Sequence, residues 1–463
     1  MIHKTIRQIQ AMIKIENDLS QIEDIEIKGV AIDSRKIEKG NLFIPFKGEN
    51  ADGHGFVEDA IGKGAAAAFW QKDVPNPPLH LPILIVEDTL AALQELARAY
   101  LSELTTKIVG ITGSNGKTTT KDMTANLLSL KYKVQKTEGN FNNHIGLPLT
   151  ILSLKPETEI TVLEMGMSGR GEIDFLTHLA RPDAVIITNI GESHLLDLGS
   201  REGIAEAKLE IINGLKNGGL IVYQGDEPLL SERIQEYSGN ASIRTFGRSE
   251  KNDLYPSEIH QNDNGSTFKV NGSKETFSLP VLGTHNVLNA LAAMLTARFF
   301  GIPYEEMNEG FSGLKLTNMR MEIVEGENGE KIINDAYNAS PTSMNAAVEL
   351  VSNLSGYKNK ILVLGDMLEL GPQEEQFHYH VGANLNPEKV NYVFTYGELG
   401  QYIAKGAKSV LPEGRVLAFL DKNELISELK KHTTCHETLI LVKASRGMKL
   451  EEVVVALQKK NRN

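Results

Sequence analysis

A short stretch of the chain, residues 108–120, joins a β-branched run to a glycine-rich turn and then to a lysine–threonine pair. This order predicts a strand, a tight turn and a helix, whose apolar positions share one face: Met123, Leu127 and Leu130. Gly113 and Gly116 let backbone N–H groups surround phosphate oxygens, and the helix N-terminus adds positive charge. Lys117 then reaches the terminal phosphates, and the Thr118 hydroxyl can ligate Mg²⁺.

The spacing of this loop departs from the standard pattern G-x-x-x-x-G-K-[ST], because Ile111 occupies the position reserved for the first glycine. A tight turn that binds no ligand is the structural alternative, but such a turn does not require a lysine–threonine pair at the head of the helix. We therefore expect the loop to bind a nucleotide.

β-branched runs alternate with helical or polar stretches, which is typical of parallel sheets covered by helices. In the middle of the chain these runs are 107–112, 160–165, 184–190 and 219–223, and in the last third they are 331–335, 360–366, 392–396, 415–419 and 438–444. Shorter runs at 30–32, 42–46 and 84–86 precede them, followed by a helical pattern that ends at Leu104. A helical stretch at 288–299 leads to a boundary near 314–318.

The chain has 463 residues, which is more than one hydrophobic core normally serves, and we expect three α/β domains. Residues 1–104 are predicted to form a small α/β domain. Residues 105–315 are predicted to form a central domain with the phosphate-binding loop on a parallel sheet, and residues 316–463 a Rossmann-like domain.

Composition argues against several other classes of protein. With 41% hydrophobic and 23% charged residues the chain is an ordinary globular protein, and its net charge of −12 disfavours nucleic-acid binding as the main task. The single cysteine, Cys435, excludes an intrachain disulfide and fits a reducing compartment. No apolar run approaches the roughly 20 residues that span a bilayer, and the N-terminal residues are too charged for a signal peptide. We expect a cytoplasmic protein.

Two polar residues follow strands of the predicted central sheet. Glu164 ends the run 160–165, and His194 comes shortly after the run 184–190. Because ligands bind at the carboxyl ends of parallel strands, both residues are expected near the phosphate-binding loop. Carboxylate, hydroxyl and imidazole groups there suit Mg²⁺ or Mn²⁺ on nucleotide phosphates. The alternative for His194 is an ordinary loop residue without a ligand.

Lys208 has an unexpected position on a predicted helix that begins near Arg201. The apolar residues of this helix form one stripe: Ile204, Ile211, Ile212 and Leu215. Lys208 falls inside the stripe, so its side chain is predicted to point inward. Either its stem packs while its ammonium reaches water, or the side chain enters the nucleotide site.

Two motifs indicate a family. The loop reads G-x-T-G-x-N-G-K-T, and Thr188 and Asn189 are followed by His194 and by a helical E-A-K-x-E segment at 206–210. Both resemble the superfamily of Mur ligases and folylpolyglutamate synthetases. The resemblance implies an ATP-dependent ligase that activates a carboxylate as an acyl phosphate and joins it to an amine. It implies that seven loop residues contact ATP: Gly113, Ser114, Asn115, Gly116, Lys117, Thr118 and Thr119.

The resemblance also implies roles beyond the loop. Asn289 is expected at the adenine; in addition, Thr284 or Asn286 can cap the helix that begins there. Asp335 is expected at the ribose. Arg320, from the third domain, is expected at the γ-phosphate. The implied metal ligands, for one or two Mg²⁺ ions, are Thr118, Glu164, His194 and Lys208. In this family the lysine is often carbamylated. The implied catalytic residues are Lys117, Lys208, His194 and Arg320.

Further stretches resemble the MurF branch of the Mur ligases, which adds D-alanyl-D-alanine to UDP-MurNAc-tripeptide in peptidoglycan synthesis. Residues 33–35, 39–48 and 52–56 resemble the UDP-binding domain of MurE and MurF, while the D-N-P-R signature of MurE is absent. Segments 139–148, 364–371 and 442–448 resemble MurF. The implied substrate-binding residues are Ser34, Arg35, Asn140, Asn142, Asn143, Asp366, Lys443, Ser445 and Arg446. We expect a monomer without nucleic-acid or membrane partners.

Two alternatives remain at this point. A folylpolyglutamate synthetase shares the ATP motifs but lacks a UDP-binding N-terminal domain, which the first hundred residues resemble. A P-loop switch or binding module uses ATP without ligation, and it needs neither an inward lysine nor an arginine from a third domain.

Overall fold

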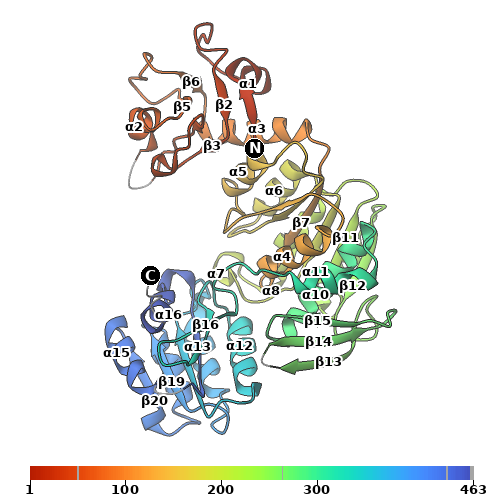
Figure 1. The fold of residues 1–463 in the computed structure, drawn as a ribbon, viewed down its shortest axis with the longest axis vertical. Helices are drawn as coiled ribbons and strands as arrows, with labels where there is room; N and C mark the ends of the chain where they lie inside the picture. The colour runs from red at the N-terminus through yellow and green to blue at the C-terminus, as the bar shows by residue number, and fades with distance from the viewer. Residues whose placement is uncertain (49–51, 263, 434–435, 459–463) are drawn as a thin grey trace.

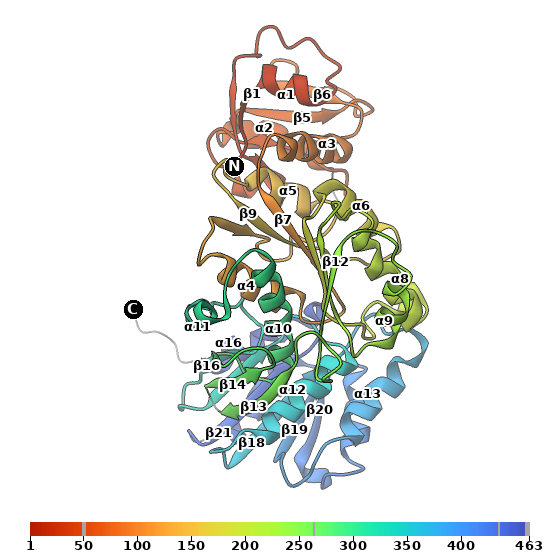
Figure 2. The ribbon, with the colours of Figure 1, turned by 90° about the vertical axis from the view of Figure 1, so that its right-hand side faces the viewer.

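The computed structural model describes residues 1–48, 52–262, 264–433 and 436–458. Cys435 lies outside the described residues. The chain forms three α/β units in succession along the long axis of the molecule, with the N-terminal unit at one end and the C-terminal unit at the other (Figure 1 and Figure 2). This confirms the predicted three-domain α/β fold. Within the described ranges, no helix is both long and apolar enough to cross a bilayer.

The N-terminal unit contains a four-stranded parallel sheet of order β3-β4-β5-β6 and an antiparallel pair, β1-β2. Its elements are β1 (His3–Thr5), α1 (Ile6–Met12), β2 (Glu26–Lys28), β3 (Val30–Ala31), β4 (Leu42–Phe43), α2 (Val57–Gly62), β5 (Ala67–Gln71), β6 (Ile83–Val86) and α3 (Thr89–Ser102). The predicted strand 42–46 is shorter than expected, because Pro45 cannot donate to a strand ladder. β5 was not predicted, since its alanine-rich sequence lacks a strand pattern.

The central unit contains a six-stranded parallel sheet of order β12-β11-β10-β7-β9-β8. Its strands are β7 (Lys107–Thr112), β8 (Val134–Lys136), β9 (Ile160–Glu164), β10 (Ala184–Ile187), β11 (Leu220–Gln224) and β12 (Ser242–Phe246). Its helices are α4 (Lys117–Leu128), α5 (Gly146–Ser153), α6 (Glu172–Ala180), α7 (Leu195–Leu198), α8 (Arg201–Leu209), α9 (Pro228–Ile234), α10 (Thr284–Phe299) and α11 (Met307–Ser312). The four predicted strands of this sheet are confirmed.

A small antiparallel sheet, β13 (Pro256–Asn262), β14 (Gly265–Val270) and β15 (Thr276–Leu279), was not predicted. β13 has no buried residue, and its sequence lacks the alternation of apolar and polar residues that predicts a strand. The predicted helix 288–299 begins earlier, at Thr284, and the helix that carries Lys208 ends at Leu209. Leu215, predicted in the apolar stripe of that helix, lies beyond its end and beyond the 3-10 turn Glu210–Ile212.

The C-terminal unit contains a six-stranded sheet of order β16-β17-β21-β18-β19-β20, in which only the edge strand β16 runs antiparallel among the described strands. Its strands are β16 (Glu322–Glu325), β17 (Lys331–Asp335), β18 (Asn359–Gly365), β19 (Tyr392–Tyr396), β20 (Val416–Phe419) and β21 (Thr438–Lys443). Its helices are α12 (Pro341–Asn353), α13 (Glu374–Ala383), α14 (Gly400–Ala407), α15 (Lys422–His432) and α16 (Glu451–Leu457). The five predicted strands are confirmed, and β16 is additional.

Two hydrophobic layers fix the position of the central sheet. α4 and α10 pack on one face, where Met123 and Leu127 join Leu291 and Met294 in one buried cluster. The other face contributes to a cluster that also includes residues of α6 and α8. β7 lies between β10 and β9, so the loop after β7 opens at the carboxyl edge of the sheet, where polar groups can gather without disturbing the core.

Candidate active site

The predicted strand, turn and helix of the phosphate-binding loop are all present, between the end of β7 and the start of α4. Gly113 and Gly116 have φ angles of 148° and 80°, which residues with a Cβ rarely adopt. A Cβ at Gly113 would overlap the Thr188 hydroxyl, and a Cβ at Gly116 would lie 2.5 Å from Asn289 Oδ1. Backbone geometry and packing therefore both require glycine at these positions.

The end of β10 holds the loop in shape. The backbone N–H of Asn115 donates to Asn189 Oδ1 over 2.9 Å, and the backbone N–H of Ser114 donates to the Asn189 carbonyl over 3.0 Å. The Thr188 hydroxyl donates to the Asn115 carbonyl over 2.6 Å. These contacts order the loop through protein groups alone, so less conformational entropy is lost when a ligand binds.

Lys117 lies folded over the same loop. Its ammonium donates to the Gly113 carbonyl over 2.6 Å and to the Ser114 carbonyl over 3.4 Å. Burial lowers the pKa of Lys117, the Glu164 carboxylate opposes this effect, and the charge of Arg320 adds to it. The ammonium is thus available at the loop, because carbonyl partners are readily exchanged for phosphate oxygens, which carry charge.

Glu164 reaches the head of α4, as the strand-end position predicts. Its Oε2 accepts a hydrogen bond from the Thr118 hydroxyl over 2.9 Å, and its Oε1 accepts one from the Asn142 amide over 2.9 Å. The carboxylate is 3% exposed. Glu164 and Thr118 therefore form an oxygen-rich pair beside the loop, and Asn142, which was expected at the substrate, lies within the same cluster.

Arg320 enters this cluster from the segment that leads into the C-terminal unit. Its guanidinium donates to the Thr118 hydroxyl over 3.2 Å and lies 4.2 Å from the centroid of the Tyr337 ring. Its Nε is buried without a hydrogen-bond partner. A buried donor without a partner is costly, so this nitrogen is a candidate contact for an anionic ligand.

His194 follows β10 at the start of α7, where it adopts a left-handed backbone conformation with φ of 64°. Its Nδ1 lies 2.9 Å from Oε2 of Glu369, which belongs to the C-terminal unit. Burial lowers the pKa of His194, and the charges of Lys117 and Lys208 act in the same direction. The neutral imidazole, the form that can ligate a metal, is therefore favoured.

Among the residues that the structure describes, no three His, Cys, Asp or Glu side chains surround a common metal position. Of the four predicted metal ligands, Thr118 and Glu164 are in direct contact. A hydroxyl and one carboxylate nevertheless fit Mg²⁺, because this ion commonly takes one or two protein oxygens and fills its remaining positions with phosphate oxygens and water.

Lys208 points inward, as its position in the apolar stripe predicts. It is 1% exposed, and no described residue forms a hydrogen bond or an ion pair with its ammonium. Burial lowers the pKa of Lys208 well below its ordinary value, and the charge of Lys117 adds to this effect. The stem of the side chain is therefore buried, unlike that of a surface lysine.

A cavity of about 160 Å³ lies between the loop, α10 and the C-terminal unit. The predicted residues that line it are Ser114, Asn115, Gly116, Lys117, Thr119, Asn289, Arg320, Asp335 and Lys443. The sequence did not identify other lining residues, among them His285, Asn286, Asn338 and Ser343. Two of these, His285 and Asn286, lie in α10 together with Asn289, the residue expected at the adenine.

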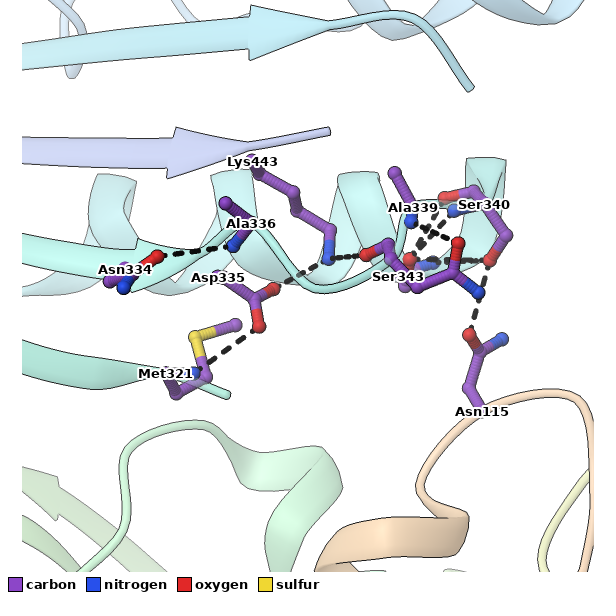
Figure 3. Close-up of polar contacts among 10 residues, drawn as sticks. Asn115, Met321, Asn334, Asp335, Ala336, Ala339, Ser340, Ser343 and Lys443 are labelled. Carbon is purple, nitrogen blue, oxygen red and sulfur yellow. Dashed lines mark hydrogen bonds and ion pairs between the residues drawn. The ribbon is translucent and has the colours of Figure 1, made fainter. Parts of the chain in front are cut away.

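Figure 3 shows the C-terminal side of this cavity. The ammonium of Lys443 lies 2.5 Å from Asp335 Oδ2 and donates to the Asn338 carbonyl over 2.9 Å. The backbone N–H of Met321 donates to Asp335 Oδ1 over 3.2 Å. Asp335, expected at the ribose, and Lys443, expected at the substrate, therefore form one buried ion pair at the carboxyl ends of β17 and β21.

A second contact in Figure 3 joins the loop to the C-terminal unit and was not predicted. The Ser340 hydroxyl donates to Asn115 Oδ1 over 3.2 Å. Ser340 also caps α12, where its Oγ accepts from the backbone N–H of Ser343. The sequence S-P-T-S is a recognisable helix start, and this signal could have identified Ser340 as an ordered residue after β17.

The other substrate-binding residues predicted in the C-terminal unit follow strands of the same sheet. Asp366 Oδ1 accepts from the backbone N–H of Gly400 at the start of α14, and burial raises the pKa of Asp366. The Ser445 hydroxyl accepts from the backbone N–H of Leu368 over 2.9 Å. Arg446 is exposed and pairs with Glu451 over 2.8 Å. Asp366 and Ser445 thus build the edge, whereas the Arg446 side chain is open to solvent.

The N-terminal unit and the central unit enclose a second cavity, of about 540 Å³. Asp33, Lys36, Lys136 and Phe141 are among its lining residues, whereas Ser34 and Arg35 are not. The Arg35 guanidinium instead pairs with Asp33 over 2.8 Å, with 83% of its side chain exposed.

The remaining loop residues expected at the substrate differ in their surroundings. Asn140 is exposed, and its carbonyl accepts from the backbone N–H of Asn142. Asn143 Oδ1 accepts from the backbone N–H groups of Ile145 and Gly146 at the start of α5. The Asn143 side chain therefore fixes the start of α5, whereas Asn140 contributes its backbone carbonyl to the turn.

Family profiles match three successive parts of the chain. The profile described as Mur ligase family, catalytic domain matches residues 26–101; Mur ligase middle domain matches residues 111–297; and Mur ligase, glutamate ligase domain matches residues 319–446.

Named relatives and solved structures match nearly the whole length. The chain is 54% identical to "UDP-N-acetylmuramoyl-tripeptide--D-alanyl-D-alanine ligase" of Bacillus subtilis over 98% of both chains. It is 34% identical to the Escherichia coli protein of the same name over 99% of both. MurF from Acinetobacter baumannii superposes with a TM-score of 0.89 at 30% identity, covering 99% of this chain and 100% of that one. MurF ligase from Thermotoga maritima in complex with ADP gives a TM-score of 0.80 at 29% identity, covering 93% and 96%. On its sequence and its structure together, the chain belongs to the Mur ligase family.

Proposed function

We propose that this protein is the ATP-dependent ligase that joins D-alanyl-D-alanine to UDP-MurNAc-tripeptide and forms UDP-MurNAc-pentapeptide, ADP and phosphate, a cytoplasmic step of peptidoglycan synthesis. The observation that carries the proposal is the 54% identity with a named ligase of this activity over 98% of both chains. The ADP complex of a relative at 29% identity supports ATP as the phosphate donor.

The reaction has two steps. An oxygen of the tripeptide carboxylate attacks the γ-phosphorus of ATP, and the bond from that phosphorus to the ADP oxygen breaks, which gives an acyl phosphate and ADP. The amine of D-alanyl-D-alanine then attacks the acyl carbon, the bond to the phosphate oxygen breaks, and the amine loses a proton. Phosphoryl transfer of this kind depends on positioning and on neutralising charge.

Lys117 and Arg320 are the groups we assign to that charge. Lys117 lies over the loop, and the buried Nε of Arg320 has no protein partner. Thr118 and Glu164 would hold Mg²⁺, which would neutralise phosphate oxygens when bound. His194 is assigned to the same metal region. Asn289 is assigned to the adenine and Asp335 to the ribose, since both line the cavity beside the loop.

Lys208 is assigned to a carbamate. A buried lysine without a protein partner is more stable as a neutral amine than as an ammonium, and the neutral amine is the form that adds to CO₂. The amine nitrogen forms a bond to the carbon of CO₂ and releases a proton, so the product is an anion that would contribute to a second Mg²⁺ site. The protein's own contribution is the burial of this side chain on α8, which lowers the pKa of the amine.

The substrates are assigned to the other two units. We propose that residues 1–104 bind the UDP substrate, that residues 105–315 bind ATP, and that residues 316–463 contribute to the binding of both ATP and D-alanyl-D-alanine. The cavity lined by Asp33 and Lys36 supports a UDP site between the first two, with Ser34 and Arg35 at its edge. Asn140, Asn142 and Asn143 are assigned to substrate binding, since Asn142 donates to Glu164 and the adjacent Phe141 lines this cavity. Asp366, Lys443, Ser445 and Arg446 are assigned to the dipeptide.

One assay tests the function. Phosphate release by the purified protein is measured with ATP, Mg²⁺, UDP-MurNAc-tripeptide and D-Ala-D-Ala, with each omitted in turn. Release only when all four are present is the expected result. Turnover with glutamate and a folate would identify a folylpolyglutamate synthetase, and ATP hydrolysis that ignores both substrates would identify a P-loop switch; either outcome rejects the proposal.

A further inference from the structure

One face of α4 holds the segment that delivers Arg320. Three polar residues lie on this face at intervals of four positions: Thr118, Asp122 and Asn126. The Asn126 amide donates to the Gly310 carbonyl, Asp122 accepts from Thr317, and Thr118 accepts from Arg320. The segment 310–320 therefore runs along the helix in the opposite direction and reaches the phosphate-binding loop at its end.

The side chain of Asp122 is completely buried, and both oxygens of its carboxylate have protein partners. Its Oδ1 lies 2.7 Å from the ammonium of Lys136 and 3.4 Å from that of Lys121. Its Oδ2 accepts two hydrogen bonds from Thr317, one from the backbone N–H over 2.8 Å and one from the hydroxyl over 2.9 Å. The lysines thus fix one oxygen and leave the other for Thr317.

The backbone beside Arg320 is strained. Met319 and Met321 have φ angles of 61° and 51°, in the left-handed region that L residues seldom adopt. Such conformations persist only where surrounding contacts hold them. The backbone N–H of Met319 donates to Glu322 and that of Met321 to Asp335, so carboxylates of the C-terminal unit hold the residues immediately before and after Arg320.

We infer that Asp122 is a positioning residue for the ligase reaction: through its hydrogen bond with the Thr317 hydroxyl it fixes the segment 310–320 on α4 and so places the Arg320 guanidinium against Thr118. Asp122 contacts no part of the nucleotide cavity itself, because it lies one helical turn beyond Thr118 and is buried. The inference rests on the proposed function, because it requires Arg320 to act on the transferring phosphate.

The experiment compares Thr317→Val with Thr317→Ser, because replacing Asp122 would leave Lys121 buried without its carboxylate. The valine variant keeps the β-branched shape and the backbone N–H but loses the hydroxyl, whereas the serine variant keeps the hydroxyl. We expect Thr317→Val to lower kcat about 10-fold, the kinetic equivalent of one hydrogen bond to a charged group, with little change in KM for ATP. Thr317→Ser restores kcat.

A double-mutant cycle shows whether the effect passes through Arg320. In an Arg320→Ala background Thr317→Val should lower kcat no further, whereas a general loss of stability would act independently of the arginine. Equal losses in both backgrounds, or a valine variant with wild-type kcat, would overturn the inference. A wild-type kcat for Arg320→Ala alone would instead reject the role proposed for Arg320.

Trypsin provides a readout that does not depend on turnover. Lys315 is exposed and lies within the segment. Thr317→Val should increase the rate of cleavage after Lys315 while the Tm stays at the wild-type value, because the segment detaches locally without unfolding of the core. Unchanged cleavage would show that the Thr317 hydroxyl does not hold the segment and would overturn the inference.

Discussion

The guanidinium of Arg320 donates a hydrogen bond to the hydroxyl of Thr118 over 3.2 Å, although 202 positions separate the two residues. Thr118 belongs to the loop that would receive the phosphates, and Arg320 belongs to the chain that enters the C-terminal unit. The proposed site for phosphoryl transfer is therefore built from residues of both units. Substitutions in either unit should then affect turnover, and kcat and KM are measured separately for each.

Replacing Lys117 by alanine should lower kcat by a factor of about 10² to 10³ or more, because the ammonium stabilises charge that develops on the transferring phosphate. The fold should persist, since the ammonium donates only to two loop carbonyls. Phosphate release and Tm are measured together, with the exposed Lys133→Ala as the control. A folded Lys117→Ala protein with near wild-type turnover would show that the loop lysine is not catalytic.

Replacing Arg35 by alanine should raise KM for the UDP substrate about 10-fold, consistent with loss of a charged hydrogen bond, and leave KM for ATP unchanged. Arg35 lies in the N-terminal unit, far along the chain from the loop, and its side chain is exposed, so stability should hardly change. Arg7→Ala, an exposed arginine of the same unit, is the control. An equal loss of affinity for ATP would contradict the assignment of this unit to UDP.

The parts of the site that the sequence predicted are those that depend on residues close together in the chain. The loop, the inward direction of Lys208 and the strand-end position of Glu164 follow from periodicity and from the geometry of parallel sheets. The contact of Ser340 with Asn115 spans 225 positions, and it exists only because two separately folded units meet. No local pattern contains that information.

Asp122 shows a second limit of sequence reasoning. A polar residue four positions after Thr118 resembles the solvent face of an amphipathic helix, yet here it is buried. α4 is covered on several sides, by α10, by α11 and by the segment that carries Thr317, so ten of its twelve residues are buried. Which side of a helix faces water is decided by the elements that pack on it, and these come from distant parts of the chain.

The buried His285 should make the free energy of unfolding depend on pH. Burial lowers the pKa of His285 from 6.5 to about 4; Asp335 opposes this effect, and the charges of Lys443 and Arg248 add to it. Between these two values the unfolded chain binds more protons than the folded chain, so stability falls as the pH decreases through this window. At pH 5 the loss from this residue is about 2 kcal/mol relative to neutral pH.

The corresponding measurement is the decrease in Tm between pH 7.5 and pH 5 for the wild type and for His285→Gln. The glutamine variant cannot take up the proton and should lose less stability on acidification. His260→Gln, whose side chain is 77% exposed, is the control and should behave like the wild type. Equal decreases for wild type and His285→Gln would show that this histidine is not held neutral in the folded chain.

Rescue of a Lys208 variant by small molecules can distinguish two chemical states of this buried side chain, a carbamate and an ammonium. If the amine carries a carbamate, Lys208→Ala removes an anion, and bicarbonate or short carboxylates should partly restore phosphate release by entering the vacated space. If the side chain is an ammonium that pairs with phosphate, small amines should restore activity and bicarbonate should not. Because burial lowers the pKa of Lys208 well below its ordinary value, we expect the carboxylate rescue.

The matched control for this rescue is Lys208→Met, which fills the same space without a charge. It should fold, since an apolar side chain of similar volume suits a site that is 1% exposed, and it should be inactive and resist every additive because no space is left. Phosphate release is therefore measured for both variants across a series of carboxylates and amines of increasing size, with Tm as the check on folding. Rescue of the alanine variant that declines as the carboxylate grows, with none for methionine, is the expected pattern. A Lys208→Ala protein that folds, ligates at the wild-type rate and ignores both kinds of additive would remove Lys208 from the site.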